Sequence, residues 1–150
     1  MKIKELIISF IFAIVISACA NTEKQMVSNE LTFFDSTVFD RELSMAMKAR
    51  EDTIEVDPIV KFSPNDIPER LGKWFYTIDK HEGKLETEDT STNTRGLLGA
   101  VTGIDLIISL GKKIRDKMLY NPARNYDAAL YYKADEGVVE KVVFTRKAGS

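Results

Sequence analysis

Residues 126–146 read YDAALYYKADEGVVEKVVFTR, and they predict a β-hairpin. Tyr126–Lys133 and Val138–Arg146 are rich in valine and tyrosine, which favour strands. Between them lies Ala134-Asp135-Glu136-Gly137, where Gly137 can adopt the positive φ that a hairpin turn requires. The C-terminal end of the chain is therefore expected to supply a pair of antiparallel strands.

An amphipathic helix is predicted before this hairpin, between Asp66 and Gly83. Its apolar residues recur at i, i+4, i+7, i+8 and i+11, so they share one face that we expect to be buried. They are Ile67, Leu71, Trp74, Phe75 and Ile78. The start, Asp66-Ile67-Pro68-Glu69, resembles a capping box in which Asp66 is the N-cap and Glu69 reaches back. Gly83 is expected to end the helix.

Three further elements are predicted from the same periodicities. A short helix over about 37–49 has four apolar residues at helical spacing, namely Phe39, Leu43, Ala46 and Met47. Residues 53–62 alternate as in a half-buried strand, with Ile54, Val56, Val60 and Phe62 on one side. Pro58 would mark an edge or a bulge of that strand. Residues 84–87 form a short strand, and 88–95 form a polar loop.

Together with a long apolar helix over 97–119, the predicted order is α-β-α-β-α-β-β. This order indicates an α+β domain, in which two to three helices cover a mainly antiparallel sheet of about four strands. The chain has 150 residues, a length typical of one domain, and we place that domain at 31–150.

The predicted helix over 97–119 is unusual because its first half is apolar on almost all sides. Leu106 and Leu110 lie nearly opposite its main apolar face, and Leu98 lies toward the flank. The second half is basic, with Lys112, Lys113 and Lys117. These six residues are therefore candidates for contact with a partner protein or a membrane. The alternative is a core helix whose lysines complement its C-terminal dipole.

The N-terminus has the organisation of a secretion signal. A positive start, Met1–Glu5, precedes an apolar run, Leu6–Ala18, which is too short to make a good transmembrane helix. The run ends in Ile16-Ser17-Ala18-Cys19, which resembles the lipobox of bacterial lipoproteins. The resemblance implies that residues 1–18 are removed and that Cys19 carries acyl chains. Residues 19–30 would then be the lipidated cysteine and a flexible tether.

In Gram-negative lipoproteins, an aspartate after the cysteine favours the inner membrane. Ala20 occupies that position here, so the resemblance implies the outer membrane, with the domain in the periplasm. The resemblance covers the leader alone and implies nothing about the activity of the domain.

The residues that catalysis most often uses are scarce. His81 is the single histidine, and Cys19 is the single cysteine, so a catalytic triad, a two-histidine metal site and a free nucleophilic thiol are not expected. Asp89–Ala100 begins like an EF-hand loop but lacks its glycine and its final glutamate. We expect no metal and no cofactor. Glu86, Glu88 and Asp89 are the remaining candidates, as paired carboxylates for glycan hydrolysis.

Three functions follow, in decreasing order of support. The first is a non-catalytic envelope lipoprotein that binds another envelope protein as an accessory or assembly factor. The second is a lipid-handling or membrane-surface module that uses the 97–119 helix, and the third is an enzyme that acts on cell-wall glycan. The formal net charge of −2 gives no reason to expect nucleic acid as a partner.

Overall fold

The computed structural model describes residues 29–91 and 116–149 of the chain. Within these ranges lie five strands: β1 (Glu30–Phe33), β2 (Thr53–Pro58), β3 (Leu85–Asp89), β4 (Tyr126–Lys133) and β5 (Val138–Arg146). The described helices are α2 (Thr37–Lys48), α3 (Glu69–Lys80) and the short α5 (Lys117–Tyr120). A 3₁₀ segment, η3 (Asn121–Asn125), joins α5 to β4.

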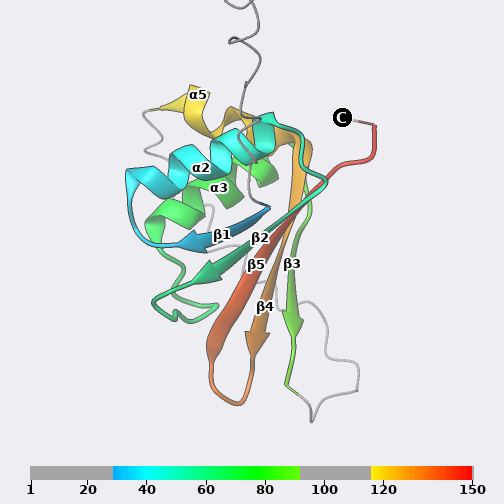
Figure 1. Cartoon of the computed structure of the whole chain (residues 1–150). Helices are drawn as coiled ribbons and strands as arrows, with labels where there is room; N and C mark the ends of the chain where they lie inside the picture. Colours follow the sequence, from blue (N-terminus) through cyan, green and yellow to red (C-terminus); the bar gives the residue numbers. More distant parts are fainter. Residues whose placement is uncertain (1–28, 92–115, 150) are drawn as a thin grey trace, which may run out of the picture.

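The five strands form one mixed sheet in the order β1-β2-β5-β4-β3 (Figure 1). The two central pairings, β2 with β5 and β4 with β5, are antiparallel. The two outer pairings, β1 with β2 and β3 with β4, are parallel. Parallel neighbours need a crossover connection, and α2 provides the one between β1 and β2.

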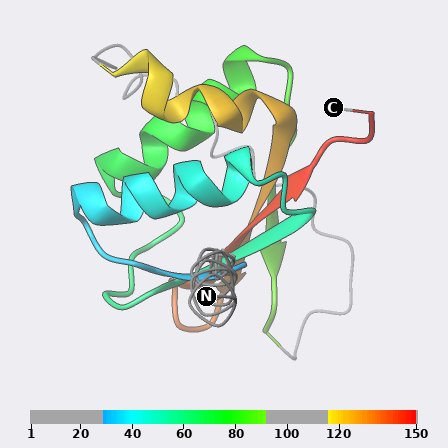
Figure 2. The same ribbon diagram turned by 45° about the horizontal axis from the view of Figure 1, so that its top comes forward.

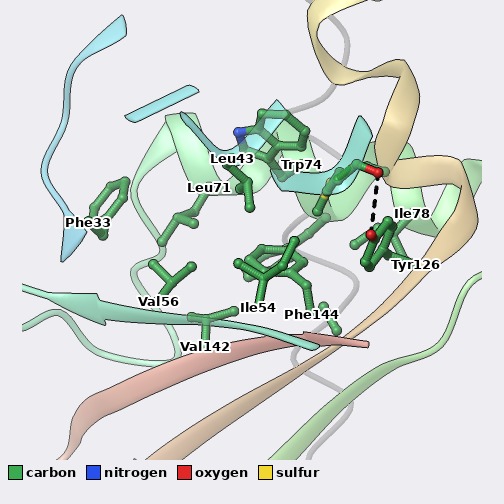
Figure 3. Close-up of a cluster of buried hydrophobic side chains, with 14 of the residues drawn as sticks. Phe33, Leu43, Ile54, Val56, Leu71, Trp74, Ile78, Tyr126, Val142 and Phe144 are labelled. Atoms are coloured by element: carbon green, nitrogen blue, oxygen red, sulfur yellow. Dashed lines mark hydrogen bonds between the residues drawn. The ribbon is translucent and has the colours of Figure 1, made fainter. Parts of the chain in front are cut away.

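Helices α2, α3 and α5 lie together on one face of the sheet (Figure 2). The core fills the space between these two layers, and Figure 3 shows labelled side chains from both layers pointing into it. Trp74 and Ile78 enter from α3, while Ile54 and Phe144 enter from β2 and β5, and all four are fully buried. The arrangement is a two-layer α+β fold.

The structure confirms three of the predicted elements almost to the residue. Helix α2 matches the helix expected over 37–49, and Ser36 caps it by accepting hydrogen bonds from the N–H groups of Val38 and Phe39. Strands β4 and β5 have the expected bounds, and Gly137 in their turn has a φ of 67°. In α3, the four residues from Leu71 to Ile78 that were expected to be buried are fully buried. Ile67 is partly buried and packs against this core.

The predicted four-stranded, mainly antiparallel sheet is wrong in detail. Strand β1 adds a fifth strand at the start of the domain, and β3 joins the other edge in parallel. Glu30, the last residue of the segment predicted as tether, lies in β1 and is paired with Glu55. Residues 30–33 are too few to show a strand periodicity, and only Phe33 of the four is buried. Their strand conformation depends on pairing with β2.

The strand predicted over 53–62 ends at Pro58, four residues early. Ile54 and Val56 point into the core as expected, but Val60 is 76% exposed. Pro58 pairs with Phe33 at the end of β1, so it marks the end of both strands. Strand β3, by contrast, is longer than expected and includes Glu88 and Asp89.

The predicted capping box at the start of α3 is also wrong. The helix begins at Glu69, its N-cap is Pro68, and no side chain caps it. Asp66 is instead part of a preceding turn, where its N–H donates to the carbonyl oxygen of Ser63 at 3.0 Å. The rigid ring of Pro68 holds a φ of −52°, and its nitrogen carries no hydrogen that would need an acceptor.

The helix predicted over 97–119 does not continue to Leu119 as one element. Asp116 has a φ of −104° and a ψ of 79°, which is not helical, and α5 begins after it. The Asp116 carboxylate accepts a hydrogen bond from the N–H of Leu119 at 3.1 Å and so starts a new turn. The rest of the predicted helix, 97–115, lies outside the described residues. Among the described helices, none is long and apolar enough to span a bilayer.

Both longer helices end in a Schellman motif whose left-handed residue is not glycine. These residues are Arg50 after α2 (φ 62°) and Glu82 after α3 (φ 60°). The N–H of each one, and that of the residue after it, donates to a carbonyl oxygen in the last helical turn. A left-handed conformation costs an L-residue about 1–2 kcal/mol, and glycine usually occupies this position. Arg50 and Glu82 are therefore locally strained.

Candidate binding groove

A buried carboxylate connects the three described helices. Asp40 on α2 is 1% exposed. Its Oδ1 accepts a hydrogen bond from the Trp74 indole nitrogen on α3 at 2.9 Å. Its Oδ2 accepts from the Tyr120 hydroxyl at 3.1 Å and also bonds the guanidinium of Arg70. Because a buried charge is tolerated only when it is paired and hydrogen-bonded, this network fixes α5 against α2 and α3.

Packing supports the same attachment of α5. The rings of Trp74 and Tyr120 meet edge to face, with centroids 4.7 Å apart. Burial raises the pKa of the Tyr120 phenol, and the negative charge of Asp40 raises it further, so the hydroxyl stays protonated and remains a donor. This short helix is therefore held by both apolar and polar contacts.

The 3₁₀ segment η3 continues this layer toward the sheet. Ala123 is fully buried in it. At the start of β4 lies Tyr126, which is labelled in Figure 3. Its hydroxyl donates to the carbonyl oxygen of Glu51 at 2.7 Å and approaches that of Met47 at 3.4 Å. Lys147 donates to the carbonyl oxygen of Arg124 at 3.0 Å. The end of α2 and the α5–η3 segment are thus held at fixed positions beside each other.

A groove of about 650 Å³ lies between the end of α2 and the α5–η3 segment, and we call it the α2–α5 groove. Its volume falls in the range of about 300–1,000 Å³ that is usual for ligand sites. Four apolar side chains line it: Met47, Met118, Leu119 and Pro122. Met47 is buried and belongs to the floor, whereas Met118 is 84% exposed at the rim.

The charged residues of the α2–α5 groove are mainly cations. Lys48 and Arg50 come from the end of α2, and Lys117 and Arg124 come from α5 and η3. All four are exposed, and none forms an ion pair with another described residue. The one carboxylate in the lining, Asp116, caps α5. Among the described residues, the groove therefore offers an anionic ligand four cations and one carboxylate around an apolar floor, so its lining is positive on balance.

Of the contact residues predicted from the sequence, Lys117 lines this groove and is exposed. Leu98, Leu106, Leu110, Lys112 and Lys113 lie outside the described residues, as does Cys19. The other three cations of the groove had no sequence signal beyond their charge. Asp40 did have one, because it lies on the same helical stripe as Leu43, Ser44 and Met47. A carboxylate on an apolar stripe indicates a buried partner.

A second hollow, of about 330 Å³, lies on the opposite face of the sheet, beside β3 and β4. Glu86 and Glu88, two of the carboxylates considered for glycan hydrolysis, line it together with Asp127. Asp127 accepts a hydrogen bond from the N–H of Lys84 at 2.8 Å, so it holds the start of β3. The described residues that line this second hollow include neither histidine nor cysteine.

The third carboxylate considered for catalysis, Asp89, has a structural contact. Its Oδ1 accepts hydrogen bonds from Ser91 and from the N–H of Ala134, which ties the end of β3 to the hairpin. His81 is exposed at the C-cap of α3, as its position in the sequence predicts. Among the described residues, no group of three or more His, Cys, Asp or Glu side chains is placed to hold a metal ion.

Comparison of the chain with protein-family models, with characterised proteins and with solved structures finds no match.

Proposed function

We propose that this chain is a lipid-anchored envelope protein without catalytic activity, and that its domain binds another envelope protein through the α2–α5 groove. The observation that carries the proposal is the set of four cations around an apolar floor, none of which forms an ion pair within the described ranges 29–91 and 116–149. Protein interfaces combine an apolar core with a polar rim of complementary charges, and methionine and arginine are enriched in them. Removal of residues 1–18 and acylation of Cys19 would hold the domain at the membrane that contains its partner.

The lining of the groove supports binding rather than catalysis. Lysine and arginine donate hydrogen bonds and attract anions, and the single carboxylate, Asp116, already accepts a backbone hydrogen bond. Arginine is the residue type best suited to hold a carboxylate through two parallel hydrogen bonds. Arg50 and Arg124 are both exposed and available for such contacts.

Lipidation of Cys19 is tested by mass spectrometry of the mature protein from its native host. The expected N-terminus is Cys19 with acyl mass attached, because the tetrad 16–19 resembles a lipobox. Cys19→Ser should leave the leader uncleaved or the protein released from the membrane fraction. An intact Met1 or an unmodified Cys19 thiol in the wild-type protein would contradict the anchor.

Binding of a protein by the groove is tested with a photo-crosslinking amino acid placed in the full-length chain in its native host. At the position of Met118, on the rim of the groove, we expect a discrete protein adduct after illumination. The matched control is the position of Met45, which is 42% exposed on α2 but does not line the groove. An adduct with lipid alone at position 118 would support the membrane-surface function instead, and equal adducts at both positions would contradict a specific groove.

A further inference from the structure

The cations of the α2–α5 groove come from both of its sides. Lys48 is the last residue of α2 and Arg50 lies two residues beyond it, while Lys117 and Arg124 belong to the segment that faces them. A flat anionic surface would contact the rims of such a groove, but a segment of chain can enter between the two sides and meet all four charges. The geometry therefore favours a chain segment over a membrane plane as the occupant.

The floor of the groove places a second requirement on the ligand. Met47 is buried, and Leu119 and Pro122 are half-buried, so the bottom of the groove is apolar. A ligand made only of carboxylates would leave this area in contact with water. A segment that also carries an apolar side chain would cover it and gain the free energy of apolar burial.

Arg50 provides an independent observation. It occupies a left-handed position where glycine would remove the strain, and its side chain lines the groove. The Asp40 network and the Tyr126 hydroxyl hold the surrounding backbone without using the Arg50 side chain. Glu82 has the same conformation but does not line the groove, so it is the strain together with the place of the Arg50 side chain that points to a role in binding.

We infer that the α2–α5 groove binds an acidic segment of the partner protein that carries an apolar side chain, and that Arg50 is a binding residue for its carboxylates. This inference rests on the proposed function and names the chemistry of the partner at the same site. Charge complementarity sets the carboxylates against the four cations, and the apolar side chain lies on Met47 and Leu119.

The test uses fluorescence anisotropy of a short labelled peptide made of glutamate, aspartate and leucine, with the whole mature chain and at physiological ionic strength. Wild type should bind this peptide and should not bind its glutamine and asparagine analogue. Arg50→Gly should weaken binding about 10-fold or more, since a hydrogen bond to a charged group contributes about 1.5–3 kcal/mol. Lys117→Glu should weaken it at least as much, by an amount that decreases at high salt.

Glu82→Gly is the matched control, because Glu82 has the same strained position at the end of α3 and does not line the groove. Both glycine variants should raise the melting temperature, by about 2–6 °C, since each removes a left-handed L-residue. Only Arg50→Gly should lose affinity. A more stable protein that binds less well separates a binding role from a structural one. Lys61→Glu, in the loop after β2, controls for net charge.

Three outcomes would overturn the inference. The first is absence of peptide binding by wild type, and the second is equal binding by wild type and Arg50→Gly. In the third outcome, wild type binds phosphatidylglycerol vesicles but not the peptide, and Arg50→Gly and Lys117→Glu abolish the binding to vesicles. The occupant of the groove would then be a lipid surface. None of these results affects the crosslinking test at position 118, which reports whether any protein occupies the groove.

Discussion

Asp40→Ala is expected to lower the free energy of unfolding by about 3–5 kcal/mol, because each buried donor left without an acceptor costs about 1–3 kcal/mol and the ion pair with Arg70 is lost as well. The substitution leaves two buried donors without their acceptor, namely the Trp74 indole N–H and the Tyr120 hydroxyl, and it removes one of the two carboxylates that bond the Arg70 guanidinium. Because the stability of a domain is only about 5–15 kcal/mol, a large fraction of the protein would unfold at moderate temperature. Urea denaturation, monitored through tryptophan fluorescence, measures this loss in the free energy of unfolding.

The matched control is Asp35→Ala. Asp35 bonds the same guanidinium at 2.6 Å, but its side chain is 70% exposed. An exposed ion pair contributes about 1 kcal/mol or less, so this variant should remain close to wild type. If Asp35→Ala and Asp40→Ala lost equal stability, burial would not be the reason for the effect. Asp40→Ala should also detach α5 from α2, because Tyr120 would lose its acceptor. The protein adduct at position 118 should then be lost.

Trp74→Ala is expected to lower the free energy of unfolding by about 3–5 kcal/mol, through loss of a fully buried aromatic side chain. The truncation removes the ring that contacts Tyr120, and it also leaves Asp40 Oδ1 without its indole donor. Trp74→Phe keeps a ring and loses only the indole donor, so about 1–3 kcal/mol is expected. Far-ultraviolet circular dichroism in urea measures both variants, since the tryptophan fluorescence signal is absent from them.

The two predictions are coupled, and the coupling is itself measurable. Trp74 Nε1 and Asp40 Oδ1 are 2.9 Å apart, so their substitutions should not be additive. Asp40→Ala combined with Trp74→Phe should cost less than the sum of the separate losses. Additive losses would mean that Trp74 and Asp40 do not interact. A loss under about 1 kcal/mol for Trp74→Ala would mean that α3 does not face the sheet in the way the structure shows.

Local sequence predicted the elements whose stability depends on their own periodicity and turns. In α3, the spacing from Leu71 to Ile78 identified the buried face because a helix brings residues three and four apart onto one side. In the hairpin, Gly137 marked the turn because few other residues accept its φ of 67°. Errors occurred where a local turn or a strand end interrupted the pattern: a Ser63–Asp66 turn precedes α3, and β2 ends at Pro58, which leaves Val60 exposed.

The candidate site was much less predictable than the fold. Lys117 was expected to contact a partner as part of a long helix, whereas in the structure it begins the short helix α5, with Asp116 as its N-cap. No sequence pattern distinguishes the other three cations of the groove, Lys48, Arg50 and Arg124. They form one site only because α2 and η3 lie side by side. The left-handed φ of Arg50 has no sequence signature, since glycine or asparagine would be expected there.

The sequence by itself determined the class of the fold, the buried faces of α2 and α3, and the hairpin of β4 and β5, because these depend on side chains within a few residues of one another. It also supplied the lipobox resemblance on which the proposed anchor rests. Only the tertiary structure decided that β1 pairs in parallel with β2, that Asp40 joins three helices, and that four cations converge on one groove. The physical reason is that a periodic pattern specifies which face of an element is apolar, whereas the choice of its partner depends on contacts between residues far apart in the chain.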